Sequence, residues 1–223
     1  MIAQSIPSPF GGAIGFAAVG VDELGDLVID AAERELIHPR AAHTRQVGFS
    51  LGRIAAHRAL EQIGSDGGPI LRGAHREPLW PTGVVGSITH SAGLALAAAA
   101  TSEQAGGLGI DLEQRRSIEN LGRFVAFGPE RDWLDSLPSS QRDDAALTLF
   151  SAKESIYKAF FPRVGEYFGF EGAGVMWDAN TEQFVGRLIA DLDPRYPPSR
   201  TFNVGCRWYG PCVLTWLLLP PGD

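Results

Sequence analysis

Lysine is almost missing from this chain of 223 residues, which has seventeen arginines but two lysines. Both of them, Lys153 and Lys158, lie in the segment FSAKESIYKAFF. A general preference for arginine accounts for the other basic positions, but it does not explain two lysines five residues apart. Because an ammonium group is a compact charge and a guanidinium group is a planar fork, we interpret this segment as one whose chemistry requires an ammonium.

Cysteine is also scarce, with Cys206 and Cys212 close together near the C-terminus. The sequence has neither a CxxC pair nor a Cys/His spacing typical of metal sites. This pattern is typical of small buried residues in a reducing compartment rather than of a disulfide framework.

Long apolar runs are missing as well, since LALAAAA and VLTWLLLP are too short to cross a bilayer. The N-terminal segment MIAQSIPSPFGGAIGF lacks the basic start and the apolar core of a signal peptide. We therefore expect a soluble cytoplasmic protein. The net charge of −7 argues against a general partner among nucleic acids or acidic membranes, so any anion site must be a local basic cluster.

Three familiar catalytic or nucleotide-binding motifs are absent. There is no GxSxG nucleophile elbow, no GxGxxG dinucleotide fingerprint and no GxxxxGK[ST] phosphate loop. What remains is a set of carboxylates suited to a metal ion, basic groups suited to phosphates, and a lysine on a helix.

The order of elements predicts an α+β fold with two similar subdomains. Helices are expected at 22–37, 41–64 and 139–161, the last with Ser140 and Asp143 as a capping pair. Each half runs from helices into antiparallel strands, and GSITHSAGLALAAAA and FNVGCRWYGPCVLTWLLL are candidate equivalent hairpins. We place the boundary between residues 1–105 and 106–223, and expect the halves to pack closely because no low-complexity linker separates them.

Two carboxylates occur in the predicted strand segment GIDLE. Asp111 and Glu113 are two residues apart, so their side chains project from the same face of a strand. Such a pair suits a hard cation such as Mg²⁺, which prefers oxygen ligands. The alternative is a solvated polar face of an edge strand.

On the predicted helix, Glu154 and Lys158 continue an apolar stripe formed by Leu147, Phe150 and Phe161. An exposed i,i+4 ion pair, worth roughly 0.2–0.5 kcal/mol, is the simple interpretation. A position within an apolar stripe favours function instead, because interior charges are costly unless they are paired or bound to a metal.

Several basic residues could bind phosphates. Arg45 and Arg53 share one helix face, roughly 12 Å apart along its axis, with Gly48 and Gly52 beside them; solvated surface arginines are the alternative. A loop after this helix carries Arg72, His75 and Arg76, and the strand segment SITHSAG carries Thr89 and His90. A lone histidine at a strand end is more often structural.

Three stretches in order, REPLWPTGVVGSITHSAG, GIDLE and FSAKESIYK, resemble the signature motifs of the 4'-phosphopantetheinyl transferase superfamily, with the first closest to its enterobactin-synthase-associated branch. The resemblance implies transfer of the phosphopantetheine arm of coenzyme A to a serine of an apo acyl or peptidyl carrier protein, releasing adenosine 3',5'-bisphosphate. It also implies a monomer built as a pseudo-dimer of two α+β halves, with the active site in the cleft between them.

The same resemblance implies a role for each candidate residue. The ligands of Mg²⁺, or of Mn²⁺ in its place, would be Asp111, Glu113 and Glu154, with a water replacing Glu113 in some members. Glu154 would be the general base and Lys158 would contact the pyrophosphate, so Asp111, Glu154 and Lys158 are the expected catalytic residues. Coenzyme A contacts are expected from Arg45, Arg53, Arg72, His75, Arg76, Thr89, His90, Asp111, Lys153, Glu154 and Lys158.

Two alternatives stay open: a non-catalytic module that binds coenzyme A or a carrier protein, and a metal-dependent phosphohydrolase acting on coenzyme A. Fatty-acid, polyketide and nonribosomal-peptide carriers are all compatible with the sequence, and the enterobactin-branch motif favours siderophore or other secondary metabolism. We expect the carrier to contact a basic and apolar surface formed by Arg115, Arg116, Arg123, Phe124 and Phe127.

Overall fold

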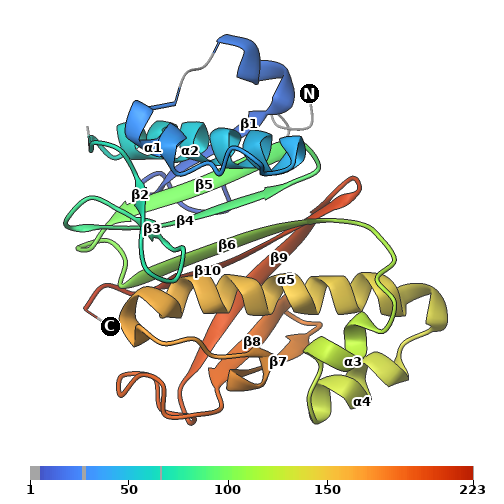
Figure 1. Cartoon of the computed structure of the whole chain (residues 1–223). Helices are drawn as coiled ribbons and strands as arrows, with labels where there is room; N and C mark the ends of the chain where they lie inside the picture. Colours follow the sequence, from blue (N-terminus) through green and yellow to red (C-terminus); the bar gives the residue numbers. More distant parts are fainter. Residues whose placement is uncertain (1–5, 27–28, 66, 223) are drawn as a thin grey trace.

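A computed structural model describes residues 6–26, 29–65 and 67–222. It confirms an α+β architecture in which two antiparallel sheets each pack against one long helix (Figure 1). The predicted helix at 41–64 is α2 (His43–Gln62), and the predicted helix at 139–161 is α5 (Ser139–Val164). The two candidate hairpins are also present, as β4–β5 in the first half and β9–β10 in the second.

The N-terminal half is a three-stranded sheet in the order β1-β5-β4 covered by α2. Its central strand, β5, belongs to two cores. Ala95, Ala97 and Ala99 pack toward α2, whereas Leu94 and Leu96 face the apolar core shared with the second half. The bounds are Gly15–Gly20 for β1, Val84–Ser91 for β4 and Leu94–Thr101 for β5.

The C-terminal half is a five-stranded sheet in the order β6-β10-β9-β8-β7, with α5 across it. Helix α5 lies very close to β6, because a Cβ at Gly109 would come within 2 Å of the Ser155 carbonyl oxygen. Glycine is therefore needed just before Asp111. The strands are β6 (Gly107–Gln114), β7 (Ala173–Asp178), β8 (Gln183–Leu188), β9 (Thr201–Tyr209) and β10 (Cys212–Leu219).

The two halves meet along β4 and β6, which are joined by side chains. The hydroxyl oxygens of Ser87, Thr89 and Ser91 accept hydrogen bonds from the backbone N–H groups of Ile110, Leu112 and Gln114, at 3.0–3.3 Å. We call this contact the hydroxyl seam. It brings the motif SITHS directly beside GIDLE. The boundary between residues 105 and 106 remains our proposal, since an apolar core that includes Leu96 and Ile110 spans both halves.

Some local predictions were wrong. The segment 22–37 was predicted as one helix, but its described residues form two short helices. Residues 27–28 lie outside the described residues. The N-terminal segment that we expect not to be a signal peptide lies in part outside them too, at residues 1–5. Helix α5 begins at Ser139 after Pro138, without the expected side-chain cap from Ser140. The shorter elements are η2 (Val21–Asp26), α1 (Ala31–Glu35), β2 (Leu71–Arg72), β3 (Pro78–Leu79), α3 (Leu121–Val125), α4 (Pro129–Ser136) and η3 (Phe170–Gly172).

The two cysteines were expected to be buried and not to form a disulfide framework. Cys206 and Cys212 are not disulfide-bonded; Cys212 packs in the core between the halves, and burial raises the pKa of Cys206 to about 11. In the described part of the chain, no helix has the length and apolar character needed to cross a lipid bilayer.

Candidate active site

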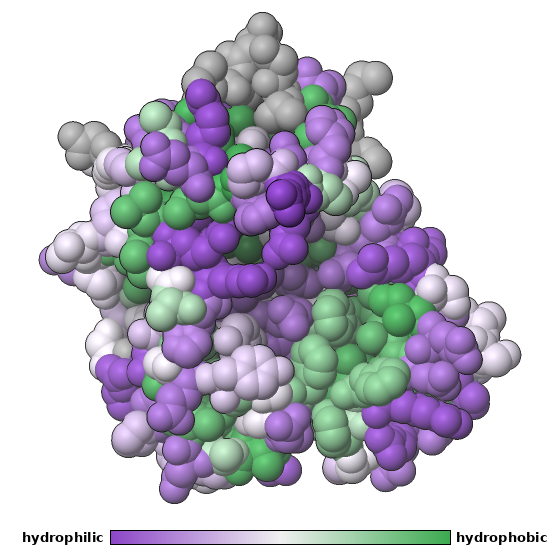
Figure 2. Space-filling model, viewed as in Figure 1, coloured by the Kyte–Doolittle hydropathy of each residue, from purple (hydrophilic) through white to green (hydrophobic). Residues whose placement is uncertain are grey.

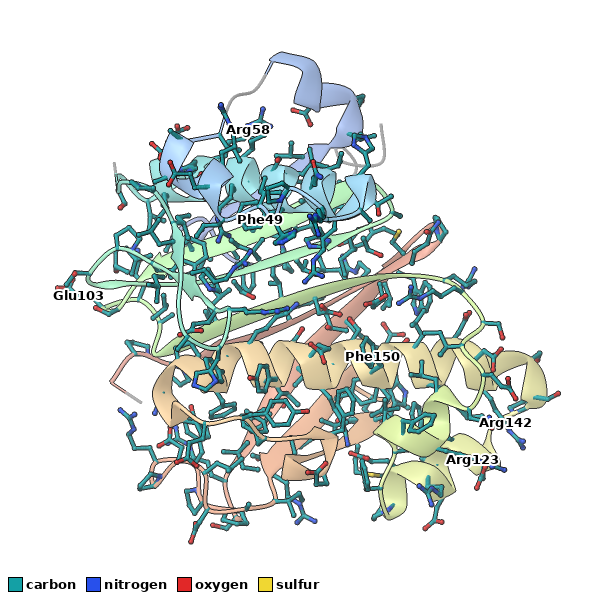
Figure 3. All side chains as sticks on the ribbon, in the orientation of Figure 1. Phe49, Arg58, Glu103, Arg123, Arg142 and Phe150 are labelled. Carbon is teal, nitrogen blue, oxygen red and sulfur yellow. The ribbon has the colours of Figure 1, made fainter. Side chains whose placement is uncertain are left out.

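The centre of the site is an ion pair at the hydroxyl seam. Asp111 on β6 is 4% exposed, and its Oδ1 accepts hydrogen bonds from Lys158 Nζ on α5 at 2.6 Å and from Thr89 Oγ1 on β4 at 3.2 Å. Lys158 Nζ also donates to the Ile110 carbonyl at 3.2 Å. Both halves therefore contribute to one cluster, because Thr89 lies on β4 of the first half and the other two residues lie on β6 and α5 of the second. Figure 3 shows side chains filling the space between α2, where Phe49 is labelled, and α5, where Phe150 is labelled.

Asp111, Glu113 and Glu154, the predicted metal ligands, concentrate negative charge around this ammonium. Burial, followed by repulsion from Asp111, raises the pKa of Glu113 to about 7. Burial also raises the pKa of Glu154, while the Lys158 ammonium opposes this shift and the Asp111 carboxylate adds to it. The surroundings therefore stabilise the ionised forms of Glu113 and Glu154 poorly, as expected where an additional cation would be favourable.

One atom supports a fit to a hard cation. Asp111 Oδ2 is buried and has no hydrogen-bond partner, and carboxylate oxygens are the donors that Mg²⁺ and Mn²⁺ prefer. However, within residues 6–26, 29–65 and 67–222, no group of three or more His, Cys, Asp or Glu side chains is close enough together to hold a metal ion. The three carboxylates are not a preformed ligand set, so their role as ligands stays a prediction.

His90 lies against α2 at the edge of this cluster. A Cβ at Gly48 would come within 2.9 Å of His90 Nδ1, so glycine allows the imidazole to approach the helix. The surrounding protein, and then the Lys158 ammonium, lower the pKa of His90, although part of the ring remains exposed. The Arg45 guanidinium lowers it further, which places His90 among cations that an anion would pair with.

Arg45 and Arg53 share a helix face, as predicted, but their surroundings differ. Arg45 is exposed, whereas Arg53 is 6% exposed. The guanidinium groups of Arg53 and Arg72 lie 4.5 and 5.4 Å from the centre of the Phe49 ring. Burial lowers the pKa of Arg53 to about 10, and Arg53 Nε is buried without a hydrogen-bond partner. Arg53 on α2 and Arg72 on β2 therefore form a second basic pair around Phe49, and Arg53 Nε lies 4.0 Å from Glu33 Oε1.

His75 and Arg76 follow Arg72 in the chain, but they lie near α5 and not near α2. They line a cavity of about 260 Å³ together with Glu154 and Lys158 of α5. The His75 ring meets the Phe161 ring edge to face, with centroids 5.5 Å apart. The cavity bridges the halves beside the Asp111–Lys158 pair.

Lys153 does not join this cluster. Its side chain is 1% exposed, and Nζ donates to Glu130 Oε2 and to the Phe170 carbonyl, both at 2.8 Å. Successive residues of a helix are rotated by roughly 100°, so Lys153 enters the interior of the C-terminal half whereas Glu154 faces the cavity. The predicted coenzyme A contact of Lys153 is not supported by this placement.

Two family models match the chain in order. The N-terminal domain model of the 4'-phosphopantetheinyl transferases matches residues 32–100, and the model of the 4'-phosphopantetheinyl transferase superfamily matches residues 107–200. The chain belongs to the 4'-phosphopantetheinyl transferase superfamily. The second match begins at residue 107, the first residue of β6.

The chain is similar to named members of the superfamily over about half to two thirds of its length. It is 38% identical to 4'-phosphopantetheinyl transferase Svp of Streptomyces mobaraensis, over 67% of this chain and 62% of Svp. It is 36% identical to Npt of Nocardia iowensis, over 69% of this chain and 68% of Npt. The match to enterobactin synthase component D of Salmonella typhi is 40% identical but spans 56% and 52% of the two chains.

Two sets of buried residues support the site but were not identified from the sequence. Glu130 is the partner of Lys153, and nothing in its local sequence predicts a contact 23 residues away. The hydroxyls of Ser151, Ser155 and Thr215 form a buried network, at 2.9 and 2.7 Å, beneath Asp111. Ser151 Oγ also donates to the Asp111 backbone carbonyl at 3.3 Å, which ties α5 to the strand that carries the carboxylate.

The Glu33–His57 pair, next to Arg53, gives a testable pH dependence of stability. The imidazole Nε2 lies 2.8 Å from Glu33 Oε1. This hydrogen bond raises the pKa of His57 above 6.5, although burial opposes the shift. Burial acts to raise the pKa of Glu33, but hydrogen bonds from His57 and the Ile70 N–H outweigh it and leave this pKa below 4.5.

The raised pKa of His57 means that its contribution to stability is present below about pH 6.5 and is lost as the pH rises through the folded-state value. The melting temperature of the wild type should therefore fall by about 2–4 °C more than that of His57→Gln between about pH 6 and pH 8.5. Calorimetry of both proteins across this range tests it, and parallel curves would contradict the assignment.

Proposed function

We propose that the chain transfers the 4'-phosphopantetheine arm of coenzyme A to a serine of an apo acyl or peptidyl carrier protein, releasing adenosine 3',5'-bisphosphate. The observation that carries this proposal is the Asp111–Lys158 pair of the C-terminal half, which Thr89 of the N-terminal half contacts, in a chain that matches both superfamily models. We also propose that the protein acts as a monomer, because one chain supplies both sides of the site. We further propose that it acts in the cytoplasm, without nucleic-acid or membrane partners.

The proposed reaction forms a bond between the serine oxygen and the phosphorus that carries pantetheine, and it breaks the bond from that phosphorus to the bridging oxygen of the pyrophosphate. Glu154 accepts the serine proton, because it is the carboxylate of α5 that lines the cavity together with Lys158. Lys158 stabilises the negative charge that develops on the departing phosphate. Asp111 holds the ammonium in place and, with Glu113 and Glu154, would hold Mg²⁺ or Mn²⁺, which supplies further charge stabilisation when bound.

Two groups of basic residues would hold coenzyme A. Arg45, Arg53 and Arg72 on the α2 side suit the phosphates of the nucleotide, because guanidinium groups bind phosphate oxygens in pairs. His75 and Arg76 border the 260 Å³ cavity, and His90 lies nearer Lys158. The hydroxyl of Thr89 already contacts Asp111 and the Leu112 N–H, so we assign Thr89 to the orientation of Asp111.

The test of this function is intact-protein mass spectrometry. The chain is mixed with coenzyme A, Mg²⁺ and a panel of apo carriers of fatty-acid, polyketide and nonribosomal-peptide type, with an EDTA control. One carrier gaining a single phosphopantetheine mass, only with metal, supports the transferase. If coenzyme A binds but no carrier gains mass, the binding-module alternative gains support; consumption of coenzyme A without a carrier would instead indicate a phosphohydrolase.

The predicted carrier surface lies beside this site. Figure 2 shows a hydrophilic band between the halves and a hydrophobic patch next to it on the C-terminal half. Phe124 and Phe127 are 67% and 41% exposed, and Arg123 lines a neighbouring cavity of about 520 Å³. Two of the predicted arginines are less available: Arg115 forms a double hydrogen bond with Asp144, and Arg116 contacts Glu113. We propose that an acidic helix of the carrier docks here.

Reversing the charge at Arg123 tests this surface. Arg123→Glu should raise the KM for the apo carrier by about tenfold and leave the KM for coenzyme A unchanged, because like charges repel at the docking face. Arg207→Glu, an equal charge change at an exposed position on β9, is the matched control. Equal effects of both variants on carrier KM would argue for a long-range charge effect and against docking at Arg123.

A further inference from the structure

The Glu130 carboxylate at the start of α4 joins four segments of the C-terminal half. It is 3% exposed. Its Oε1 accepts a hydrogen bond from the Val175 N–H on β7, and its Oε2 accepts from the Phe127 N–H before α4, each at 2.8 Å. Lys153 Nζ on α5 completes the set at 2.8 Å from Oε2. A single carboxylate therefore fixes the loop between α3 and α4 against both β7 and α5.

Lys153 extends this network toward the candidate base. Besides Glu130, Nζ donates to the Phe170 carbonyl at 2.8 Å and lies 5.1 Å from the centre of the Phe127 ring. A compact ammonium can serve all three partners at once, whereas a planar guanidinium is too large and directional for the same interior position. This need explains a lysine at a buried position in a chain that otherwise uses arginine.

One residue held by this network, Phe170, lies beside Glu154. Phe170 lines a cavity of about 180 Å³ together with Glu154 and Lys153, and its ring packs edge to face against Phe150, with centroids 5.6 Å apart. Phe127, held through its N–H and its ring, is part of the exposed apolar surface proposed for the carrier. Both aromatic residues therefore depend on the Glu130–Lys153 pair for their position relative to Glu154.

We infer that Lys153 is a positioning residue, which together with Glu130 holds Phe127 and Phe170 as an apolar surface on which the carrier protein docks beside Glu154. This inference rests on the proposed function. It assigns Lys153 to recognition of the protein substrate and not to coenzyme A, so the two lysines of the chain act on different substrates.

The test compares Lys153→Met with Lys153→Met/Glu130→Gln in the full chain. The double variant removes both charges, which avoids leaving one of them buried and unpaired. Both should raise the KM for the apo carrier roughly tenfold, with kcat and the KM for coenzyme A within about twofold of wild type. Lys158→Met is the matched control, because it should lower turnover itself. A purely structural role would lower the active fraction without separating the two KM values.

A second measurement does not depend on activity. Hydrogen exchange followed by mass spectrometry should show faster exchange of the Phe127 amide in both variants, with wild-type rates in β10. A rise in the KM for coenzyme A with an unchanged carrier KM would overturn the inference, as would unchanged exchange at Phe127. If the wild type modifies no carrier, the proposed function fails, while the exchange data still decide whether Lys153 holds this loop.

Discussion

Replacement of Lys158 by methionine is expected to lower kcat/KM for coenzyme A by about two to three orders of magnitude, the usual effect of removing one preorganised donor to a developing negative charge. Lys158 Nζ is fixed by Asp111 Oδ1 at 2.6 Å and by the Ile110 carbonyl at 3.2 Å. It therefore reaches its position before the reaction begins, and little reorganisation is needed when charge moves to the leaving phosphate. Steady-state kinetics with a carrier identified by mass spectrometry measure the loss.

Lys158→Arg makes this prediction more stringent. The charge is kept, but a guanidinium cannot sit where a 2.6 Å contact and a backbone carbonyl enclose a single nitrogen. We expect a loss of at least about tenfold, with the protein still folded by circular dichroism. Near-normal turnover in this variant would contradict both the assigned role of Lys158 and our explanation for the retention of lysine here.

Asp111→Asn is the second change with a large expected effect, a fall in the transfer rate of roughly a hundredfold or more. Asparagine keeps an oxygen that can accept from Thr89, but it removes the charge that orients Lys158. It also removes the buried Oδ2, the one carboxylate oxygen of Asp111 without a partner. Two functions of one side chain, holding the ammonium and holding a divalent cation, should therefore be lost together.

Binding of Mn²⁺, followed by electron paramagnetic resonance without substrates, tests the second of these functions apart from catalysis. Asp111→Asn should weaken Mn²⁺ binding by at least about tenfold. Glu113→Gln is the matched control with a smaller expected effect, since a water can take the place of this carboxylate. Unchanged Mn²⁺ affinity in Asp111→Asn would remove Asp111 from the proposed ligands, whatever happens to the rate.

Local patterns predicted the parts of the site that depend on one element. Asp111 lies on a strand and Glu154 on a helix, as their spacing indicated. The environment of each side chain could not be predicted, because it depends on contacts between distant segments. Arg53 is the clearest case. Its position on a helix was predicted correctly. Its ion pair with Glu33, which is distant in the sequence, could not be predicted.

The buried partners of Lys153 could not be predicted for the same reason. One step along a helix changes the direction of a side chain by roughly 100°, and the stripe that contains Glu154 and Lys158 correctly excluded Lys153. The coenzyme A contact expected of Lys153 rested on the resemblance and not on this stripe. The interior carboxylate of Glu130 and the Phe170 carbonyl offered closer partners than the cavity did, and neither is marked in the local sequence.

The hydroxyl seam between β4 and β6 also has a consequence for the behaviour of the chain in a crowded solution. Each of these strands ends its own sheet, and an open strand edge is a template on which strands of other molecules can assemble. Serine and threonine hydroxyls occupy the backbone N–H groups of β6 in the place of a neighbouring strand. The contact that assembles the site thereby covers two adhesive edges, and separation of the halves would uncover both and favour aggregation.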